Sequence, residues 1–312
     1  MVSARGLQVS GFLFAIGSAG TFALSGIFAS ALMSAGWTPG AAVTTRIGFS
    51  AILLLVPTLL MLRGRWVNVR RAWGQVLLFG LLGVAACQFA FFLAVRYIPP
   101  SLALLIEFTG PVLLIFWTWA RTRVAPSALT LLGAAIALCG LVAISGAIGN
   151  GGLHPLGVFF GLIAAIGNAS YFALGARANH GIPPLPFTGL GLGVAALLLL
   201  GASVTGLLPF EVTSAPTLLS DVEVPWWVAV AGLVLISTVF SYLFGVTAAR
   251  RLGATVSSFA AYSEPMFGIL WTILLLSIVP TGMQWLGAAL IVIGVVTVKI
   301  GELRRTHTRS SM

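Results

Sequence analysis

The sequence predicts an all-α integral membrane protein in which ten transmembrane helices form two inverted five-helix repeats. Of its 312 residues, 59% are hydrophobic and only 7% are charged, whereas about 25% are charged in a soluble domain. The mean hydropathy is +1.09. Long apolar segments recur along the whole chain, and the two halves resemble each other. These three observations exclude a soluble domain anywhere in the sequence.

The first half contains five apolar segments of the length that spans about 30 Å of hydrocarbon. The first of them follows a short stretch that carries only Arg5, and it is too long for the apolar part of a signal peptide, so we expect it to remain as a helix. Arginines or prolines separate the others. In order, the predicted helices are Gly11–Leu32, Pro39–Leu62, Trp73–Val95, Ser101–Ala120 and Pro126–Ala147.

The second half repeats this organisation after the glycine-rich connection Gly149–Gly152. Its predicted helices are Leu156–Ala176, Pro186–Leu208, Trp226–Ala249, Gly253–Leu276 and Gly282–Val298. We therefore expect one five-helix domain over residues 1–148, a second over residues 154–300 and a basic cytoplasmic tail over residues 301–312. The fifth and tenth helices carry glycines seven residues apart and few polar groups, which is typical of packing helices outside a transport pathway.

The charged residues predict how the chain crosses the membrane. The formal net charge of +10 would suit a nucleic-acid partner, but the basic residues lie in short clusters between apolar runs, as in cytoplasmic loops. With a cytoplasmic N-terminus, 14 of the 16 basic residues lie on the cytoplasmic side, whereas the opposite connection Phe210–Pro225 carries three acids and no Lys or Arg. Both termini are thus predicted to be cytoplasmic.

An internal repeat supports the inverted arrangement. A shift of 154 residues aligns Phe91–Ala143 with Gly245–Thr297 without a gap and gives 13 identities in 53 positions, where shared composition alone would give about five. Because each half holds an odd number of helices, the second half enters the membrane in the opposite direction. The alternative is a ten-helix protein whose repeat is only an old duplication.

Two glutamates lie within apolar segments, each close to a proline. Pro111 follows Glu107 by four residues and cannot donate to its carbonyl, and Pro265 follows Glu264 directly, which predicts a free carbonyl at Ala261. A carboxylate at mid-membrane costs roughly 2.5 to 3.5 kcal/mol, so a functional role as a proton or substrate site is the first hypothesis. The alternatives are pairing with an arginine and a buried packing role.

Further polar residues are candidates for the same pathway. Arg46 is basic and lies in the middle of a span, where it could bind a substrate carboxylate or neutralise one of the two acids. The other candidate residues for binding substrate or a proton are Gln88, Asn168, Tyr171, Tyr242 and Tyr262. Cys87 and Cys139 are single, and we expect both to be small packing residues.

Signatures of enzymes are lacking. The sequence has no P-loop and no zinc-protease motif, and it shows no constellation of His, Asp or Cys. We therefore expect no catalytic residues, no metal site, no cofactor and no nucleic-acid partner.

Several stretches resemble a known family. Glu107 to Pro111, preceded by Arg96 to Pro99, is similar to the fourth-helix signature of bacterial threonine/homoserine exporters in the drug/metabolite transporter superfamily, whose repeat unit is the EamA domain. Glu264 and Pro265, followed by Gln284, Leu286, Gly287 and Gly294, resemble the end of that domain, and Arg46 matches an arginine common in its second helix. The resemblance covers essentially the whole chain.

From the residues and the resemblance together, we expect a secondary transporter of the bacterial inner membrane. It would export small metabolites, with amino acids such as threonine or homoserine as the first candidates, by alternating access. A drug or nucleoside exporter is the alternative in the same class, favoured by a broad aromatic cavity. A membrane scaffold or a lipid-modifying enzyme is the alternative from another class. The expected partners are a small-molecule substrate, the lipid bilayer and a coupling proton, and the protein would be a monomer or homodimer.

Overall fold

Most of the described residues lie in helices. The structure, a computed structural model, describes residues 4–145, 154–177, 181–220, 222–276 and 279–310. Among these residues, nine helical stretches are long and apolar enough to cross a membrane. The remaining predicted span, Gly253–Leu276, is divided by a turn at Ala261 and Tyr262. The all-α membrane fold is thus confirmed, and the count of ten spans is close to the nine continuous ones.

The first repeat contains five spans, three of which consist of more than one helical piece. Its elements are α1 (Ala4–Ala23) and α2 (Ser25–Ser34), α3 (Pro39–Leu62), α4 (Trp66–Leu78) with a π-helical segment (Phe79–Ala86) and α5 (Cys87–Ala94), α6 (Pro100–Glu107) and α7 (Gly110–Thr122), and α8 (Ala128–Ser145).

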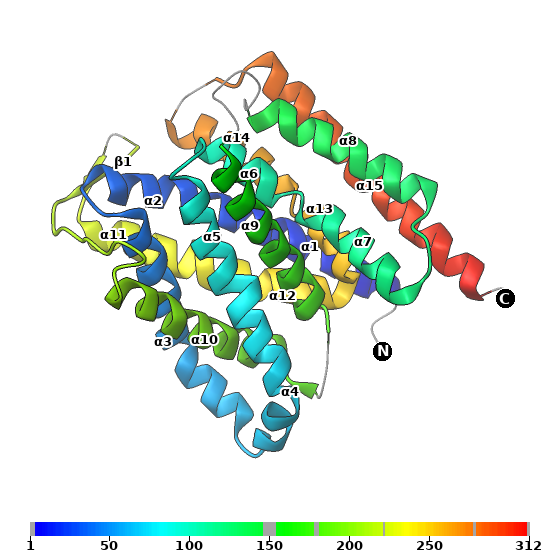
Figure 1. Cartoon of the computed structure of the whole chain (residues 1–312), viewed down its shortest axis with the longest axis horizontal. Coiled ribbons are helices and arrows are strands. Elements are labelled where there is room, and N and C mark those ends of the chain that lie inside the picture. The colour runs from blue at the N-terminus through cyan, green and yellow to red at the C-terminus, as the bar shows by residue number, and fades with distance from the viewer. Residues whose placement is uncertain (1–3, 146–153, 178–180, 221, 277–278, 311–312) are drawn as a thin grey trace.

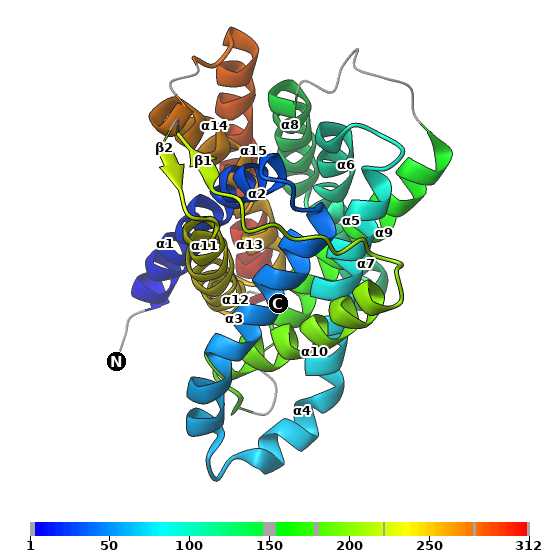
Figure 2. The same ribbon diagram turned by 90° about the vertical axis from the view of Figure 1, so that its left-hand side faces the viewer.

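The second repeat has the same order of spans, except that its first span is a single helix and a small hairpin is added. Its elements are α9 (Pro155–Gly175), α10 (Pro184–Val204), strands β1 (Thr217–Leu219) and β2 (Val222–Val224), α11 (Trp226–Ala231) with a π-helical segment (Gly232–Phe240) and α12 (Ser241–Leu252), α13 (Ala254–Ala260) and α14 (Ser263–Leu276), and α15 (Gly282–Ser310). Thr217 pairs with Val224 in the antiparallel hairpin, and β1 packs against α2 and α11 (Figure 2).

Three boundaries differ from the expectation by seven residues or more. The first span begins at Ala4 rather than Gly11. The third span begins at Trp66 rather than Trp73, because its first turns form an amphipathic helix with Val69, Ala72 and Val76 buried. The basic segment expected as a tail continues α15 as a helix to Ser310. The basic residues at these boundaries therefore lie within the helices and do not end them.

The packing of α8 against α15 shows the inversion directly. These are the fifth helices of the two repeats, and they lie side by side along one edge of the molecule (Figure 1). Gly133 lies against Gly294, and Gly140 lies against Gly287, so the two helices run antiparallel. A Cβ added at Gly140 would come within 2.6 Å of the Gly287 carbonyl oxygen, and the converse distance is also 2.6 Å. The glycine pairs predicted to serve packing thus allow the backbones to touch.

Other equivalent elements obey the same pseudo-two-fold relation. Helix α1 packs against α12 while α9 packs against α5, and the second helices α3 and α10 pack against each other. The 154-residue shift also places the π-helical segment Phe79–Ala86 onto Leu233–Phe240, which lies within the second π-helical segment. Because π-helical turns are rare and concentrate at functional sites, their recurrence at equivalent positions is a property of the repeat.

Figure 1 places the β1–β2 hairpin and the two chain ends on opposite sides of the molecule. Between these sides, one cluster of buried residues joins α3, α4, α10 and α12, and a second joins α7, α8, α13 and α15. The two clusters flank a central space, which contains the candidate site.

Candidate functional site

A cavity of about 430 Å³ lies between the two repeats. Helices from both halves contribute to its wall: α1 to α3, α5 and α6 from the first, and α9 and α12 to α14 from the second. Its polar and charged lining residues are Ser18, Ser25, Arg46, Cys87, Gln88, Glu107, Asn168, Tyr171, Ser241, Tyr242, Ser257 and Glu264. Neither α8 nor α15 appears among the lining elements that the structure describes, in agreement with the packing role expected for them.

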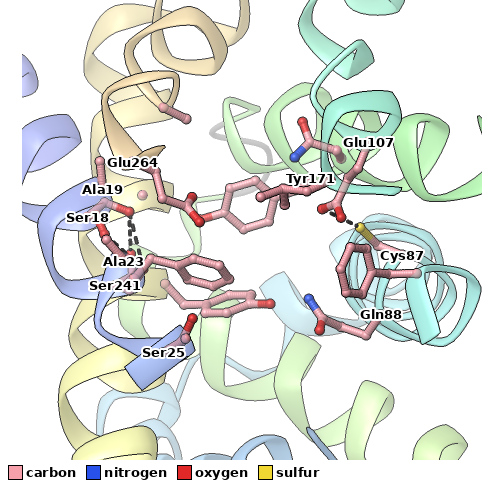
Figure 3. Close-up of a pocket in the computed structure, with 18 of the residues that line it drawn as sticks. Ser18, Ala19, Ala23, Ser25, Cys87, Gln88, Glu107, Tyr171, Ser241 and Glu264 are labelled. Atoms are coloured by element: carbon pink, nitrogen blue, oxygen red, sulfur yellow. Dashed lines mark hydrogen bonds between the residues drawn. The ribbon is translucent and has the colours of Figure 1, made fainter. Parts of the chain in front are cut away.

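A helix break positions Glu107. Helix α6 ends at this residue, and α7 begins at Gly110 with Pro111 in its first turn, where a missing N–H has no cost. Between them, the Thr109 N–H bonds to the Ile106 carbonyl at 3.0 Å, and so does the Thr109 hydroxyl at 2.7 Å. The interruption predicted from Pro111 is therefore present, and it leaves the Glu107 side chain facing the cavity (Figure 3).

A second break lies at the equivalent place in the other repeat. Helix α13 ends at Ala260 and α14 starts at Ser263, so Glu264 and Pro265 lie in its first turn. The sequence predicted a free carbonyl at Ala261, and this was wrong: that carbonyl accepts the N–H of Glu264 at 2.9 Å. Proline fits the first turn of a new helix, so the break needs no unpaired group.

The two breaks contact each other across the pseudo-two-fold axis. The Tyr262 hydroxyl donates to the Phe108 carbonyl, and the two rings meet edge to face with centroids 5.7 Å apart. These residues are 154 positions apart and hence equivalent in the repeat. Tyr262 is fully buried by this contact and does not line the cavity. The structure therefore places it in the joint between repeats rather than with the other candidates.

Glu107 lies among polar groups from two neighbouring helices. Its Oε1 is 3.5 Å from the Cys87 thiol sulfur, which is also 3.4 Å from the Ala164 carbonyl. The Asn168 side chain interacts with the same carboxyl group, while its Oδ1 has no hydrogen-bond partner in the described residues. Gly110 allows this close approach, since a Cβ there would lie 2.8 Å from Asn168 Oδ1. Cys87 thus borders the site and is not merely a packing residue.

The π-helical segments explain why particular pairs of residues face the cavity. Cys87 and Gln88 follow the first segment directly, and their repeat equivalents Ser241 and Tyr242 follow the second. All four line the cavity. A π-helical turn contains an extra residue and so rotates the helix that follows it, which turns these pairs inward.

Glu264 projects into the cavity from the side opposite Glu107, with Tyr171 between them (Figure 3). The Tyr171 hydroxyl reaches Gly245 of α12, and a Cβ at Gly245 would also lie 3.0 Å from Ser18 Oγ. Ser18 and Ser241 bond to each other's backbone carbonyls at 2.8 and 3.2 Å. Tyr171 therefore crosses the cavity and rests where α1 and α12 are tied together.

Arg46 supplies a positive charge to the same cavity. Its side chain is 7% exposed, its guanidinium carbon lies 5.2 Å from the centroid of the Phe22 ring, and its Nε has no hydrogen-bond partner among the described residues. It is close enough to interact electrostatically with both Glu107 and Glu264. A buried donor without a partner carries a desolvation cost, so the buried guanidinium is not fully satisfied by the described residues around it.

Aromatic rings cover much of the remaining wall; of these, the sequence predicted the two tyrosines but not the phenylalanines. The rings are those of Phe22, Phe91, Phe92, Phe108, Tyr171, Phe172 and Tyr242. Phenylalanine is frequent in membrane helices, and its direction is set only by packing. Met33 and Leu104 also line the cavity, and their side chains are 39% and 36% exposed.

Comparisons with known proteins agree with this architecture. The model of the EamA-like transporter family matches residues 9–146 and again residues 155–300. The chain is 24% identical over 235 residues to the Uncharacterized inner membrane transporter YicL of Salmonella typhimurium, covering 75% of each chain. It is 24% identical over 270 residues to the Uncharacterized transporter YyaM of Bacillus subtilis, covering 84% of each.

A protein of known crystal structure shares the fold, with a TM-score of 0.69 at 21% identity, over 96% of this chain and 98% of the other. The two matches of the family model together cover most of the sequence and coincide with the two structural repeats. This multi-pass membrane protein is a transporter that belongs to the EamA-like transporter family.

Proposed function

We propose that the protein is a secondary active transporter that exports amino-acid-like metabolites, with threonine and homoserine as the first candidates. The observation that carries the proposal is the position of Arg46, which lines the same cavity as two carboxylates and whose buried Nε has no hydrogen-bond partner among the described residues. A guanidinium matches a carboxylate group, and a glutamate matches an ammonium group. The cavity therefore offers complementary charges to the two ends of a zwitterion.

The volume supports a small substrate. A cavity of about 430 Å³ lies at the lower end of the range of roughly 300 to 1,000 Å³ that is typical of ligand sites. Either glutamate could also exchange a coupling proton, because a carboxyl group inside a bilayer is stable in its neutral form and can shed its proton when water reaches it. The transport cycle needs no catalytic step.

By the positive-inside rule, we place the protein in the bacterial inner membrane with both termini cytoplasmic. The hairpin side would then face outward, and we propose that the cavity opens to that side, where the lining residue Met33 is exposed. The separation of the hairpin from the chain ends supports this orientation (Figure 1).

The proposed function is tested by export of radiolabelled compounds from cells that overproduce the chain, with and without a protonophore. The panel contains threonine, homoserine, leucine, phenylalanine, a nucleoside and threonine methyl ester, which lacks the carboxylate. We expect export of at least one free amino acid, its loss with the protonophore, and no export of the ester. Export of the ester at the same rate as threonine would contradict the role of Arg46.

The aromatic wall favours a second candidate function, export of a drug or nucleoside. Seven aromatic residues line the cavity, and their faces stack well on flat rings and on organic cations. The same panel separates the candidates, because a nucleoside exporter would transport the nucleoside and leave the free amino acids inside the cell.

A further inference from the structure

Side chains from two other helices bond to the described residues on either side of positions 178–180, at the end of α9 and before α10. Arg250, near the end of α12, donates from Nη1 to the Ile182 carbonyl at 2.6 Å and from Nε to the Gly175 carbonyl at 3.4 Å. Its guanidinium carbon lies 5.1 Å from the centroid of the Phe187 ring. Gln75 of α4 donates to the Leu174 and Arg177 carbonyls at 2.7 and 3.0 Å.

These contacts close one end of the cavity. The rings of Phe79 and Phe187 lie between Arg250 and the cavity, with their centroids 4.8 Å apart. The centroid of the Tyr171 ring lies 5.4 Å from that of Phe79. Phe79 and Phe187 are almost completely buried, as is Val246 beside them. This end of the molecule is thus sealed by an aromatic layer and by the contacts of Arg250 behind it.

The repeat equivalent of Arg250 lies on the side of the hairpin, where the cavity-lining residue Met33 at the end of α2 is exposed. The 154-residue shift relates Arg250 to Arg96, whose side chain is exposed. The equivalent connection, between α2 and α3, instead bonds to the segment before the hairpin: the Thr38 N–H donates to the Glu211 carbonyl at 3.1 Å, and Trp37 Nε1 donates to the Thr213 carbonyl at 2.9 Å.

We propose that Arg250 and Arg96 are a symmetry-related pair of gate residues. Arg250 seals its end in the observed state, and Arg96 bonds to the carbonyls of the α2–α3 connection when the cavity opens at the Arg250 end. The expected acceptor is the Trp37 carbonyl, because Trp37 precedes Pro39 at the start of α3 by two residues, as Ile182 precedes Pro184 at the start of α10. This inference rests on the proposed alternating-access transport.

The physical basis is that each arginine can make its bonds in one state only. Opening the Arg250 end breaks charge-assisted hydrogen bonds, and closing the Arg96 end forms equivalent ones, so the difference in free energy between the states stays small. The seal at the Arg250 end contains Phe187, the fourth residue of α10, whereas the fourth residue of α3 is Ala42. The larger ring favours the observed state.

The test uses a cysteine at Val246 as a probe for opening of the Arg250 end, in a chain with Cys87→Ala and Cys139→Ala. Val246 is buried in the observed state, so its rate of labelling by a polar thiol reagent, added to purified protein in detergent, measures the fraction open at that end. Arg250→Gln should raise the rate about fivefold to tenfold, as expected for loss of one or two hydrogen bonds. Arg96→Gln should lower it by a similar factor. Lysine at either position should restore part of the parent behaviour.

Arg251→Gln is the matched control, since this neighbour is exposed and stacks on Phe14 instead; its labelling rate should equal that of the parent. If Arg250→Gln does not insert, Gln75→Met removes bonds from the same connection and should also raise the rate. Opposite effects of the two arginine variants support the gate. Equal rates, or changes of the same sign, overturn it. Labelling needs no substrate, so failure to export any amino acid would refute the proposed substrate without affecting this result.

Discussion

At the scale of residues, the cavity gathers one guanidinium and two carboxylates within the membrane-spanning part of the protein. Each such charge costs about 2.5 to 3.5 kcal/mol to insert, and the unpaired Arg46 Nε shows that their mutual attraction does not satisfy all donors. A substrate that brings both charges would satisfy these groups. The three side chains therefore match the zwitterionic substrate that we propose.

We predict that Glu107→Gln separates the two roles open to this carboxylate. The amide mimics the neutral acid. If Glu107 carries the coupling proton, gradient-driven export should be lost and counterflow retained. If it binds the substrate ammonium, both activities should fall at least about tenfold, the effect of losing one charged hydrogen bond. Reconstituted protein in a counterflow assay gives the answer. Glu211→Gln, the same change in an exposed loop residue, should affect neither activity, and a Glu107→Gln variant that behaves like it would show a packing role.

Glu264→Gln should impair transport while insertion and abundance stay near those of the parent. The side chain faces the cavity. It lies in the first turn of α14, which begins at Ser263, and glutamine at this position leaves the backbone of that turn unchanged. Uptake assays and immunoblots of membranes measure the two quantities. Transport at the parent rate would mean that Glu264 has no part in the cycle.

At the scale of elements, the helices of the two repeats have two kinds of role. The broken spans α6–α7 and α13–α14 bring backbone turns and acids to the centre, which is tolerated because these turns line a cavity and not the lipid. The unbroken pair α8 and α15 joins the repeats at the edge through glycine contacts. Such close packing replaces the hydrophobic driving force, which is absent between helices in a bilayer.

Gly140→Ala should destabilise the protein by about 1 to 3 kcal/mol, the usual effect of overpacking a tight contact. The added methyl group would meet the Gly287 carbonyl oxygen at 2.6 Å and the Ile291 nitrogen at 2.8 Å. Gly48→Ala is the matched control, because a Cβ at this helical glycine meets nothing within 4 Å. Thermal unfolding in detergent should show a lower midpoint for the first variant only. Equal midpoints would place α8 and α15 further apart than described.

At the scale of the whole molecule, inversion makes the two ends of the cavity chemically similar although the chain traverses them in opposite directions. The contact between Phe108 and Tyr262 joins equivalent positions of the two repeats. In the proposed alternating access, the repeats would rock about this contact while the acids stay near the centre. The asymmetry arises from residues outside the repeat match, such as the aromatic seal at Phe187.

The orientation in the membrane is tested by cysteines on the two sides. Ser214→Cys lies in the exposed segment before the hairpin and should react with an impermeant thiol reagent in intact cells, because the acidic connection is expected outside. Val67 is 59% exposed and lies in the first turn of α4. A Val67→Cys variant should react only after the membrane is permeabilised. Labelling of both in intact cells would exclude the proposed topology.

Much of the fold could be predicted from the sequence because hydropathy and repetition are local or pairwise properties of the chain. The spans, the homologous halves and the interruptions at Pro111 and Pro265 follow from composition and from proline chemistry. The boundaries at Trp66 and Ser310 could not be predicted, since amphipathic turns extend helices beyond the apolar core. The prediction of a free carbonyl at Ala261 was wrong, because a new helix starts nearby and its Glu264 N–H donates to that carbonyl.

For the site, the sequence by itself determined which residues are expensive in a membrane: Glu107, Glu264 and Arg46. Only the tertiary structure decided that they share one cavity, that Cys87 and the aromatic rings join them, and that Tyr262 lies instead in the joint between repeats. The reason is that the cost of burying a charge depends on residue type, whereas the direction of a side chain depends on helix rotation. Here π-helical segments and helix breaks set that rotation, and neither leaves a periodic signal in an apolar sequence.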